Sequence, residues 1–264
     1  SQQHRTARAT AGPWRESLPG HSLEDMADLP LLDDSDIDRV LCIVAHPDDM
    51  EYGASAAVAK WTGQEKTVAY LLLTGGEAGI RTMPPDQVAP LRAEEQARAC
   101  SIVGVDDLEI LEFPDGMLEV NQELRRAIAK KLREFRPDAV MVTNWNLETA
   151  WGLNHVDHRA AGIATVDAIR DADNPWLFTD LADSGLEAWK ASRLLVTGPD
   201  SPTDAIELSA EDVAKGVESL EAHTVYLEAL GDHPEPKDMI TDICANTGAQ
   251  AGVEYALPVR VYEM

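Results

Sequence analysis

The sequence has few cysteines and no long apolar run. Its three cysteines, Cys42, Cys100 and Cys244, stand far apart and form no CxxC pair. This pattern argues against a disulfide framework and against a cysteine zinc site, and it fits a reducing cytoplasm. The chain has no stretch of about 18 apolar residues, and its N-terminus lacks the apolar run of a signal peptide. We therefore expect a cytoplasmic protein that does not span a membrane.

Basic residues are also scarce. The chain has 22 Lys and Arg against 47 Asp and Glu, which gives a formal net charge of −25. Long-range repulsion then opposes binding to phosphate backbones and to anionic lipid surfaces. We expect neither nucleic acid nor membrane as a partner, although the acidity also suits general solubility and need not describe the substrate. The sequence allows a homo-oligomer.

The length of 264 residues suits one sizeable α/β domain. Residues 1–36 are polar, contain Pro13, Pro19 and Pro30, and show no sustained period. We predict an irregular N-terminal extension over residues 1–36 and a single domain over residues 37–264.

Apolar runs and helical patterns alternate strictly through the first half of the domain. The runs predict buried strands at residues 40–45, 67–74, 108–113 and 139–143, and the patterns between them predict helices at 50–63, 91–103 and 121–135. The later part is less regular, with helices expected at 155–171 and 210–230 and strands at 194–197 and 255–262. This alternation predicts an α/β fold with a Rossmann-like, predominantly parallel sheet flanked by helices.

Polar segments follow the predicted strand ends. His46, Gly75-Gly76-Glu77-Ala78-Gly79, Asp115 and Asn144 each come directly after a strand or shortly after it. Ligands of such sheets bind beyond the carboxyl ends of the strands, so these segments should meet in one crevice.

The segment Ala45-His46-Pro47-Asp48-Asp49 places one imidazole and two carboxylates at the floor of that crevice. One carboxylate can join the imidazole on a metal while the other remains free to accept a proton from water. Asp48 and Asp49 could instead simply cap the following helix, because aspartate is favoured at a helix N-terminus.

A second cluster favours the metal interpretation. In Asn154-His155-Val156-Asp157-His158, the two histidines are spaced i, i+3 at the start of a predicted helix, so they project from one face. Three protein ligands with one open position are typical of catalytic rather than structural zinc.

These motifs resemble the PIG-L or LmbE-like deacetylases, a family that includes the N-acetylglucosaminyl-phosphatidylinositol de-N-acetylases. The resemblance runs from about residue 40 to residue 168, and in this family glutamate often follows the aspartate pair directly, whereas here Met50 precedes Glu51. The matching segments are Ala45-His46-Pro47-Asp48-Asp49-Met50-Glu51, Thr74-Gly75-Gly76-Glu77-Ala78-Gly79, Leu91-Arg92-Ala93-Glu94-Glu95, Pro114-Asp115-Gly116 and His155-Val156-Asp157-His158.

The resemblance implies one zinc ion per chain, held by His46, Asp49 and His158, with Asp48 as the general base. The implied reaction is removal of an acetyl or other acyl group from an N-acyl amino sugar, and the expected substrate is an N-acetylglucosamine conjugate.

The resemblance also gives roles to four neighbouring residues. His155 would stabilise the oxyanion or protonate the leaving amine, Asp157 would orient His155, and Arg92 and Asp115 would contact sugar hydroxyl groups.

Other functions remain open at this stage. The same family contains amidases of thiol conjugates and enzymes that trim acylated antibiotics. A phosphoester hydrolase would usually want two metals and more basic groups. A catalytically silent, metal-containing sugar-binding protein is a further alternative, and the feature that separates it from an enzyme is Asp48, because a binder has no need for an unbound carboxylate beside the metal.

Overall fold

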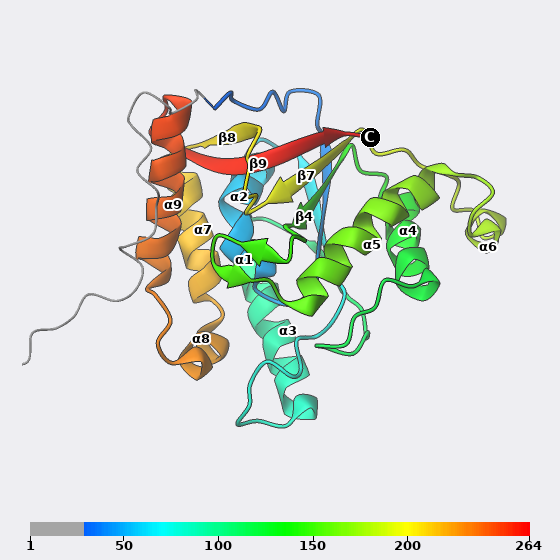
Figure 1. Ribbon diagram of the computed structural model, residues 1–264, viewed down its shortest axis with the longest axis horizontal. Coiled ribbons are helices and arrows are strands. Elements are labelled where there is room, and N and C mark those ends of the chain that lie inside the picture. The colour runs from blue at the N-terminus through cyan, green and yellow to red at the C-terminus, as the bar shows by residue number, and fades with distance from the viewer. Residues whose placement is uncertain (1–28) are drawn as a thin grey trace, which may run out of the picture.

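The computed structural model describes residues 29–264, which fold around a seven-stranded sheet of order β3-β2-β1-β4-β7-β9-β8 (Figure 1). The parallel strands are β1 (Arg39–Val44), β2 (Thr67–Leu72), β3 (Asp107–Ile110), β4 (Ala139–Thr143) and β7 (Arg193–Thr197). β9 (Tyr255–Glu263) is antiparallel to β7, and β8 (Asp204–Leu208) is antiparallel to β9. The predicted α/β fold with a mostly parallel sheet is confirmed.

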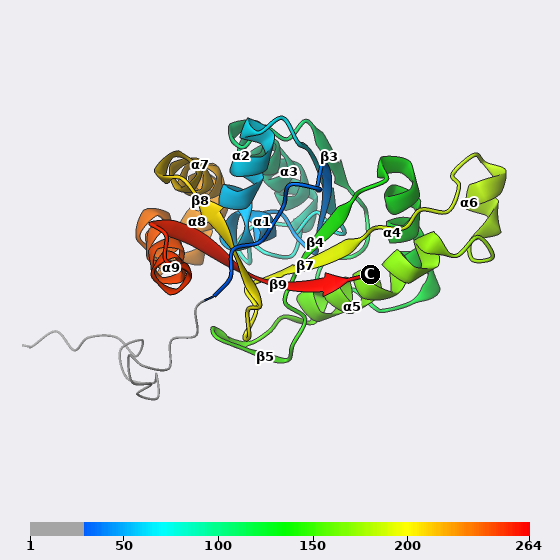
Figure 2. The same cartoon turned by 90° about the horizontal axis from the view of Figure 1, so that it is seen from above.

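Helices cover both faces of this sheet. Their bounds are α1 (Asp49–Gly53), α2 (Ser55–Gly63), α3 (Pro85–Ile102), α4 (Gln122–Phe135), α5 (Val156–Asp173), α6 (Thr179–Asp183), α7 (Ala210–Glu221), α8 (Thr224–Leu230) and α9 (Pro236–Ala251). A short hairpin of β5 (Glu148–Thr149) and β6 (Gly152–Leu153) projects from the body of the molecule (Figure 2).

The central strands β1, β2 and β4 are apolar along nearly their whole length because both faces of the sheet are buried there. Side chains alternate between the faces: Val40 and Cys42 of β1 join one apolar cluster, whereas Leu41 and Ile43 join the other. The first cluster contains residues of α2, α7 and α9, and the second contains residues of α4 and α5. The sheet is therefore the central layer of the domain.

Two of the expected helices are each divided into two. The helix predicted over residues 50–63 breaks at Ala54, whose φ of −159° is not helical. The break follows Gly53, where an added Cβ would lie 2.8 Å from Oγ1 of Thr197. The helix predicted over residues 210–230 ends at Glu221, and α8 begins after His223.

The predicted N-terminal extension is described only from residue 29; its residues 1–28 lie outside the described part of the chain. The backbone N–H of Leu32 donates to the carbonyl of Ala205 at 2.8 Å, and the N–H of Ala205 donates to Pro30 at the same distance. Residues 30–32 thus pair with Ala205 of β8. The domain boundary after residue 36 stays a prediction.

No helix within residues 29–264 combines the length and the apolarity that crossing a bilayer requires.

The parallel strands bring the sequence motifs to one edge of the sheet. His46 follows β1, the glycine-rich loop follows β2, and the residues between β4 and α5 include His155. Because parallel strands end at the same edge, these three segments meet there, as expected.

Candidate metal centre

The turn after β1 presents two aspartates in different ways. Asp48 occupies the N-cap position of α1 with a left-handed backbone (φ 82°), yet its side chain makes no cap hydrogen bond in the described structure. Aspartate tolerates this conformation better than most residues, at some cost in backbone strain. Helix capping therefore does not explain Asp48.

Asp49 joins the two histidine motifs. Its Oδ2 accepts a hydrogen bond from the backbone N–H of His46 at 2.9 Å and lies 3.5 Å from Nδ1 of the same residue. Its Oδ1 lies 3.0 Å from Nε2 of His158. Burial opposes ionisation, but the two imidazoles outweigh it and hold the pKa of Asp49 well below its usual value.

The start of α5 supplies Asp157, which is fully buried. Its carboxylate accepts hydrogen bonds from the backbone N–H groups of Gly116 (2.6 Å) and Leu118 (3.0 Å). Its Oδ2 also lies 2.9 Å from Nε2 of His46. The backbone N–H of Asp157 donates to Nδ1 of His155 at 3.1 Å. The expected role of Asp157 in orienting His155 stays a prediction.

Asp115 approaches the same imidazole. Its Oδ1 lies 3.0 Å from Nε2 of His46, and its Oδ2 accepts from the backbone N–H of Ala78 at 2.8 Å. Burial lowers the pKa of His46, but Asp49, Asp115 and Asp157 together raise it well above its usual value. The residues around His46 therefore favour positive charge at this position.

Arg92 on α3 is 2% exposed and already engaged by protein groups. It donates to the carbonyls of Gly76 (3.0 Å) and Pro47 (2.6 Å), and it lies 3.4 Å from Oδ1 of Asp48. The ring of Tyr226 stacks on its guanidinium at 3.8 Å. Gly76 has a positive φ, and an added Cβ would overlap Arg92, so the loop and the guanidinium fit closely. Contact between Arg92 and sugar hydroxyls stays a prediction.

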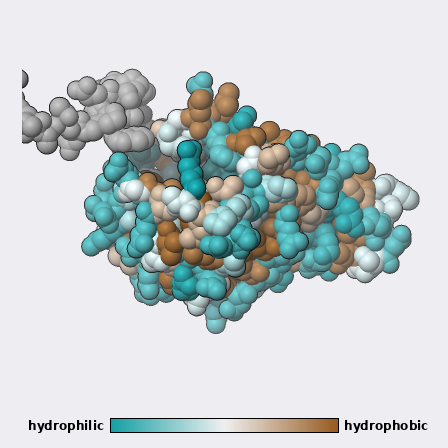
Figure 3. All heavy atoms as spheres, turned by 90° about the horizontal axis from the view of Figure 1, so that it is seen from below, coloured by the Kyte–Doolittle hydropathy of each residue, from teal (hydrophilic) through white to brown (hydrophobic). Residues whose placement is uncertain are grey.

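A cavity of about 370 Å³ opens over these side chains. The cavity lies at the carboxyl edge of the sheet. Figure 3 shows the molecule from below relative to Figure 1; on this side, hydrophobic residues lie among hydrophilic ones. The cavity is lined by His46, Asp48, Asp49, Tyr52, Ala78, Gly79, Arg92, Asp115, Gly116, His155, His158 and Tyr226. Every predicted site residue lines it except Asp157, which lies beneath His46.

Two groups of three side chains have the composition of a metal site. The nitrogen and oxygen atoms of His46, Asp49 and His158 lie within 4.8 Å of one another, and the same holds for His46, His155 and Asp157. The two groups share His46, so only one of them can use a given ring nitrogen at a time.

Comparison with known proteins identifies a matching family model. Residues 41–169 match the family model described as PIG-L: GlcNAc-PI de-N-acetylase. The similarity to this family extends over residues 41–169 of the 264-residue chain.

Curated relatives of the PIG-L domain include the diacetylchitobiose deacetylase of Thermococcus kodakarensis, which is 34% identical over 53% of this chain and 52% of the relative. A probable N-acetyl-alpha-D-glucosaminyl L-malate deacetylase 2 of Bacillus anthracis is 32% identical over 50% of this chain and 59% of the relative. The chain thus spans about half the length of the curated relatives that it matches.

A solved structure, N,N'-diacetylchitobiose deacetylase from Pyrococcus horikoshii with its inhibitor, superimposes with a TM-score of 0.77. The alignment covers 87% of this chain and 85% of the other at 22% identity. At this identity the likeness supports the fold alone.

The C-terminal part of the chain, beyond the PIG-L match, also contributes to the cavity, and no role was predicted for these residues. Tyr226 of α8 forms part of the wall. Tyr52 of α1 forms another part, and its hydroxyl contacts Nε2 of His233. Tyr52 directly follows the first motif, which ends at Glu51, whereas Tyr226 has no neighbouring motif that would have marked it.

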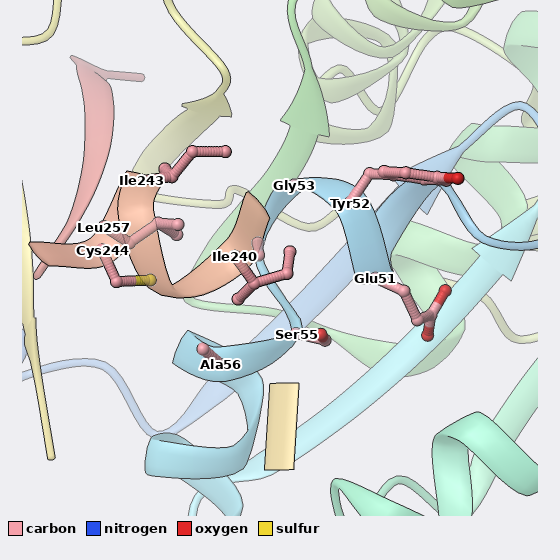
Figure 4. Close-up of a pocket in the computed structure, with 10 residues that line it drawn as sticks. Glu51, Tyr52, Gly53, Ser55, Ala56, Ile240, Ile243, Cys244 and Leu257 are labelled. Atoms are coloured by element: carbon pink, nitrogen blue, oxygen red, sulfur yellow. The ribbon is translucent and has the colours of Figure 1, made fainter. Parts of the chain in front are cut away.

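Behind the cavity, His223 is fully buried and its Nε2 lies 3.5 Å from Oε2 of Glu51. In Figure 4 the side chain of Glu51 points away from Ile240 and Cys244, which line a separate hollow of about 10 Å³. That hollow has room for about one water molecule, not for a substrate.

Proposed function

We propose that this chain is a zinc-dependent hydrolase that removes the acyl group from an N-acyl amino sugar, with Asp48 as the general base. One observation carries the proposal. The carboxylate of Asp48 lines the cavity beside Asp49 and His46, and its Oδ2 is buried and without a hydrogen-bond partner among the described residues. Leaving a buried carboxylate oxygen unpaired is costly, so a catalytic use is a better account than a structural one.

We assign the metal to His46, Asp49 and His158, as the family resemblance implies. The donor set fits zinc, which binds imidazole nitrogen and carboxylate oxygen. The alternative group of His46, His155 and Asp157 is less suited, because both carboxylate oxygens of Asp157 already accept hydrogen bonds from backbone N–H groups. Zinc bound there would supply Lewis acidity, which polarises an amide carbonyl and lowers the pKa of water to about 7.

Asp48 is placed to accept the proton of the attacking water. Burial raises the pKa of its carboxyl group to about 7, while the nearby charge of Arg92 opposes that rise. A base with a pKa close to the working pH combines a useful deprotonated fraction with a strong tendency to take up the proton. The contact of 3.4 Å with Arg92 also fixes the direction of the carboxylate.

His155 is placed to stabilise negative charge on the substrate oxygen. Its Nδ1 accepts the backbone N–H of Asp157, so the neutral ring carries its proton on Nε2. Burial and the neighbouring His46 lower the pKa of His155, which favours this neutral form. An N–H donor directed at the developing oxyanion contributes about 10²–10³ in rate. Asp48 then returns its proton to the leaving amine.

The size of the cavity and the relatives support an N-acetylglucosamine unit as the substrate. About 370 Å³ falls within the range of small-molecule sites. The two curated relatives have names that refer to different N-acetylglucosamine conjugates, so the shared part is the acetylated sugar.

The proposal is tested by release of free amine from a panel of N-acetylglucosaminides, with and without a chelator. The panel should include diacetylchitobiose, an N-acetylglucosaminyl malate and an amide-linked thiol conjugate. We expect at least one sugar substrate to be deacetylated, the chelator to stop the reaction and added zinc to restore it. Turnover of the thiol conjugate alone would favour the amidase alternative. Tight binding of a sugar without any turnover would favour a silent binding protein.

A further inference from the structure

Asn154 lies directly before His155 and is 5% exposed. Its carboxamide stands between two groups. Oδ1 is 3.0 Å from Nδ1 of His158, and Nδ2 donates to the backbone carbonyl of Asn144 at 2.6 Å. Asn154 therefore connects a proposed metal ligand to the end of β4.

The two contacts fix the orientation of the carboxamide. A backbone carbonyl can only accept a hydrogen bond, so the NH₂ group must face Asn144 and the oxygen must face His158. An amide oxygen is in turn only an acceptor, which requires a proton on Nδ1 of His158. The other ring nitrogen, Nε2, lies 3.0 Å from the carboxylate of Asp49, which also only accepts, so without a metal Nε2 carries a proton as well. A metal ligand has to give up the proton on Nε2; Nδ1 then keeps its own proton, and the lone pair on Nε2 is free for the metal.

Asn144 is itself held firmly at the carboxyl ends of β4 and β7. Its backbone N–H donates to the carbonyl of Thr197 at 3.1 Å. Its side-chain amide donates to Gly198 O and to Oδ2 of Asp200, each at 3.1 Å. A continuous series of hydrogen bonds thus runs from the rigid sheet through Asn154 to His158.

His46 is held in the opposite way. Carboxylates of Asp115 and Asp157 face its Nε2, so Nε2 carries the proton and Nδ1 faces Asp49. In each ring a hydrogen-bond acceptor lies beside the nitrogen that is farther from Asp49, and the other nitrogen faces Asp49. For His46 the acceptors are charged; for His158 the acceptor is the neutral Asn154.

We propose that Asn154 is a positioning residue that locks His158 as the Nδ1–H tautomer and so directs Nε2 to the metal. This inference rests on the metal centre proposed above, but not on the identity of the substrate. Groups that hold the remote nitrogen of a ligating histidine typically contribute about 10–100-fold to metal affinity.

The test measures zinc binding and the ring proton, with no substrate present. Zinc affinity is measured by competition with a chromophoric chelator, and the Nδ1–H signal of His158 is followed by ¹⁵N NMR of the zinc-loaded protein. The variants are Asn154→Leu, which removes both contacts, and Asn154→Asp, which keeps the acceptor. Asn146→Ala is the matched control, because Asn146 is an exposed amide of the same connection that donates to Asp200.

We expect Asn154→Leu to bind zinc about 10–100-fold more weakly and to lose the Nδ1–H signal through exchange with water. Asn154→Asp should retain the signal and most of the affinity, and Asn146→Ala should match the wild type. Wild-type affinity in Asn154→Leu would overturn the proposal. If that variant does not fold, Asn154→Asp decides: loss of both affinity and signal in the folded protein would equally overturn it. Absence of deacetylase activity would leave these readouts unchanged, so the two proposals fail separately.

Discussion

The carboxylate of Asp157 contacts His46 rather than the neighbouring His155, with 2.9 Å between Oδ2 and Nε2. The second motif therefore supports the histidine of the first motif, 111 residues earlier in the chain. The two histidines of the i, i+3 pair differ in their surroundings: His158 faces Asp49, and His155 lies at the cavity surface.

The first prediction concerns the metal ligands. His158→Ala should lose most of its zinc while the fold stays intact, because the buried strands do not depend on this side chain. His155→Ala is the matched control one helical turn away, and it should keep zinc while losing activity. Metal analysis of the two purified variants decides between them. Full zinc occupancy in His158→Ala would reject the ligand assignment.

Arg92 gives the second prediction. Arg92→Ala should keep zinc but lose most of kcat/KM, because the guanidinium lies 3.4 Å from Asp48 and lines the cavity. The measurement is steady-state kinetics on an N-acetyl sugar beside zinc analysis. Normal turnover in this variant would show that neither sugar contact nor orientation of Asp48 depends on Arg92.

The third prediction concerns stability and uses two arginines of α4. Arg133 is 2% exposed and donates to the carbonyls of five residues, which are Asp171, Ala172, Asn174, Leu177 and Phe178. Arg133→Ala leaves these carbonyls without their donor, and we expect a loss of about 3 kcal/mol.

Such a loss should lower the Tm by about 6 to 12 °C. The matched control is Arg126→Ala, which removes only an exposed ion pair with Asp180 and should barely change the Tm. Thermal unfolding of both variants provides the measurement. Equal decreases in Tm for the two variants would show that the buried carbonyl contacts of Arg133 stabilise the fold no more than the exposed ion pair of Arg126.

The fourth prediction is a pH dependence. A general base acts only when deprotonated, so kcat/KM should fall as the pH drops through the pKa of Asp48. Burial raises that pKa to about 7 in the metal-free protein, and the positive charge of zinc lowers it. The acidic limb of the profile should therefore lie at or below about pH 7. A limb well above this value would show that another group controls the rate.

Much of the fold was predictable because its signals are local. The strands at 40–45 and 139–143 are apolar runs that end at polar segments, and both lie within one residue of the observed bounds. Burial on both faces of a parallel sheet makes such runs continuous. The paired histidine and aspartate motifs were likewise readable, because each is compact in sequence.

The remaining features depend on contacts that are distant in sequence. α9 was missed, although Pro236 at its start and the spacing of Ile240 and Cys244 are helical signals. β8 was also missed, and the antiparallel direction of β9 depends on how α9 returns the chain to the sheet, which no local pattern encodes. The contact between Asp157 and His46 was not predicted for the same reason, since it joins the start of α5 to the end of β1, 111 residues earlier.

The most direct test of the central claim is a zinc titration of the metal-free protein during deacetylation of an N-acetylglucosaminide. We predict that the rate rises with added zinc and stops rising at one equivalent per chain. Asp48→Asn should bind the same equivalent but run about 10²–10⁴-fold more slowly at every zinc concentration. Asp49→Asn should bind zinc more weakly and recover part of its activity with excess metal. A rate that is independent of zinc, or wild-type turnover by Asp48→Asn, would contradict the account.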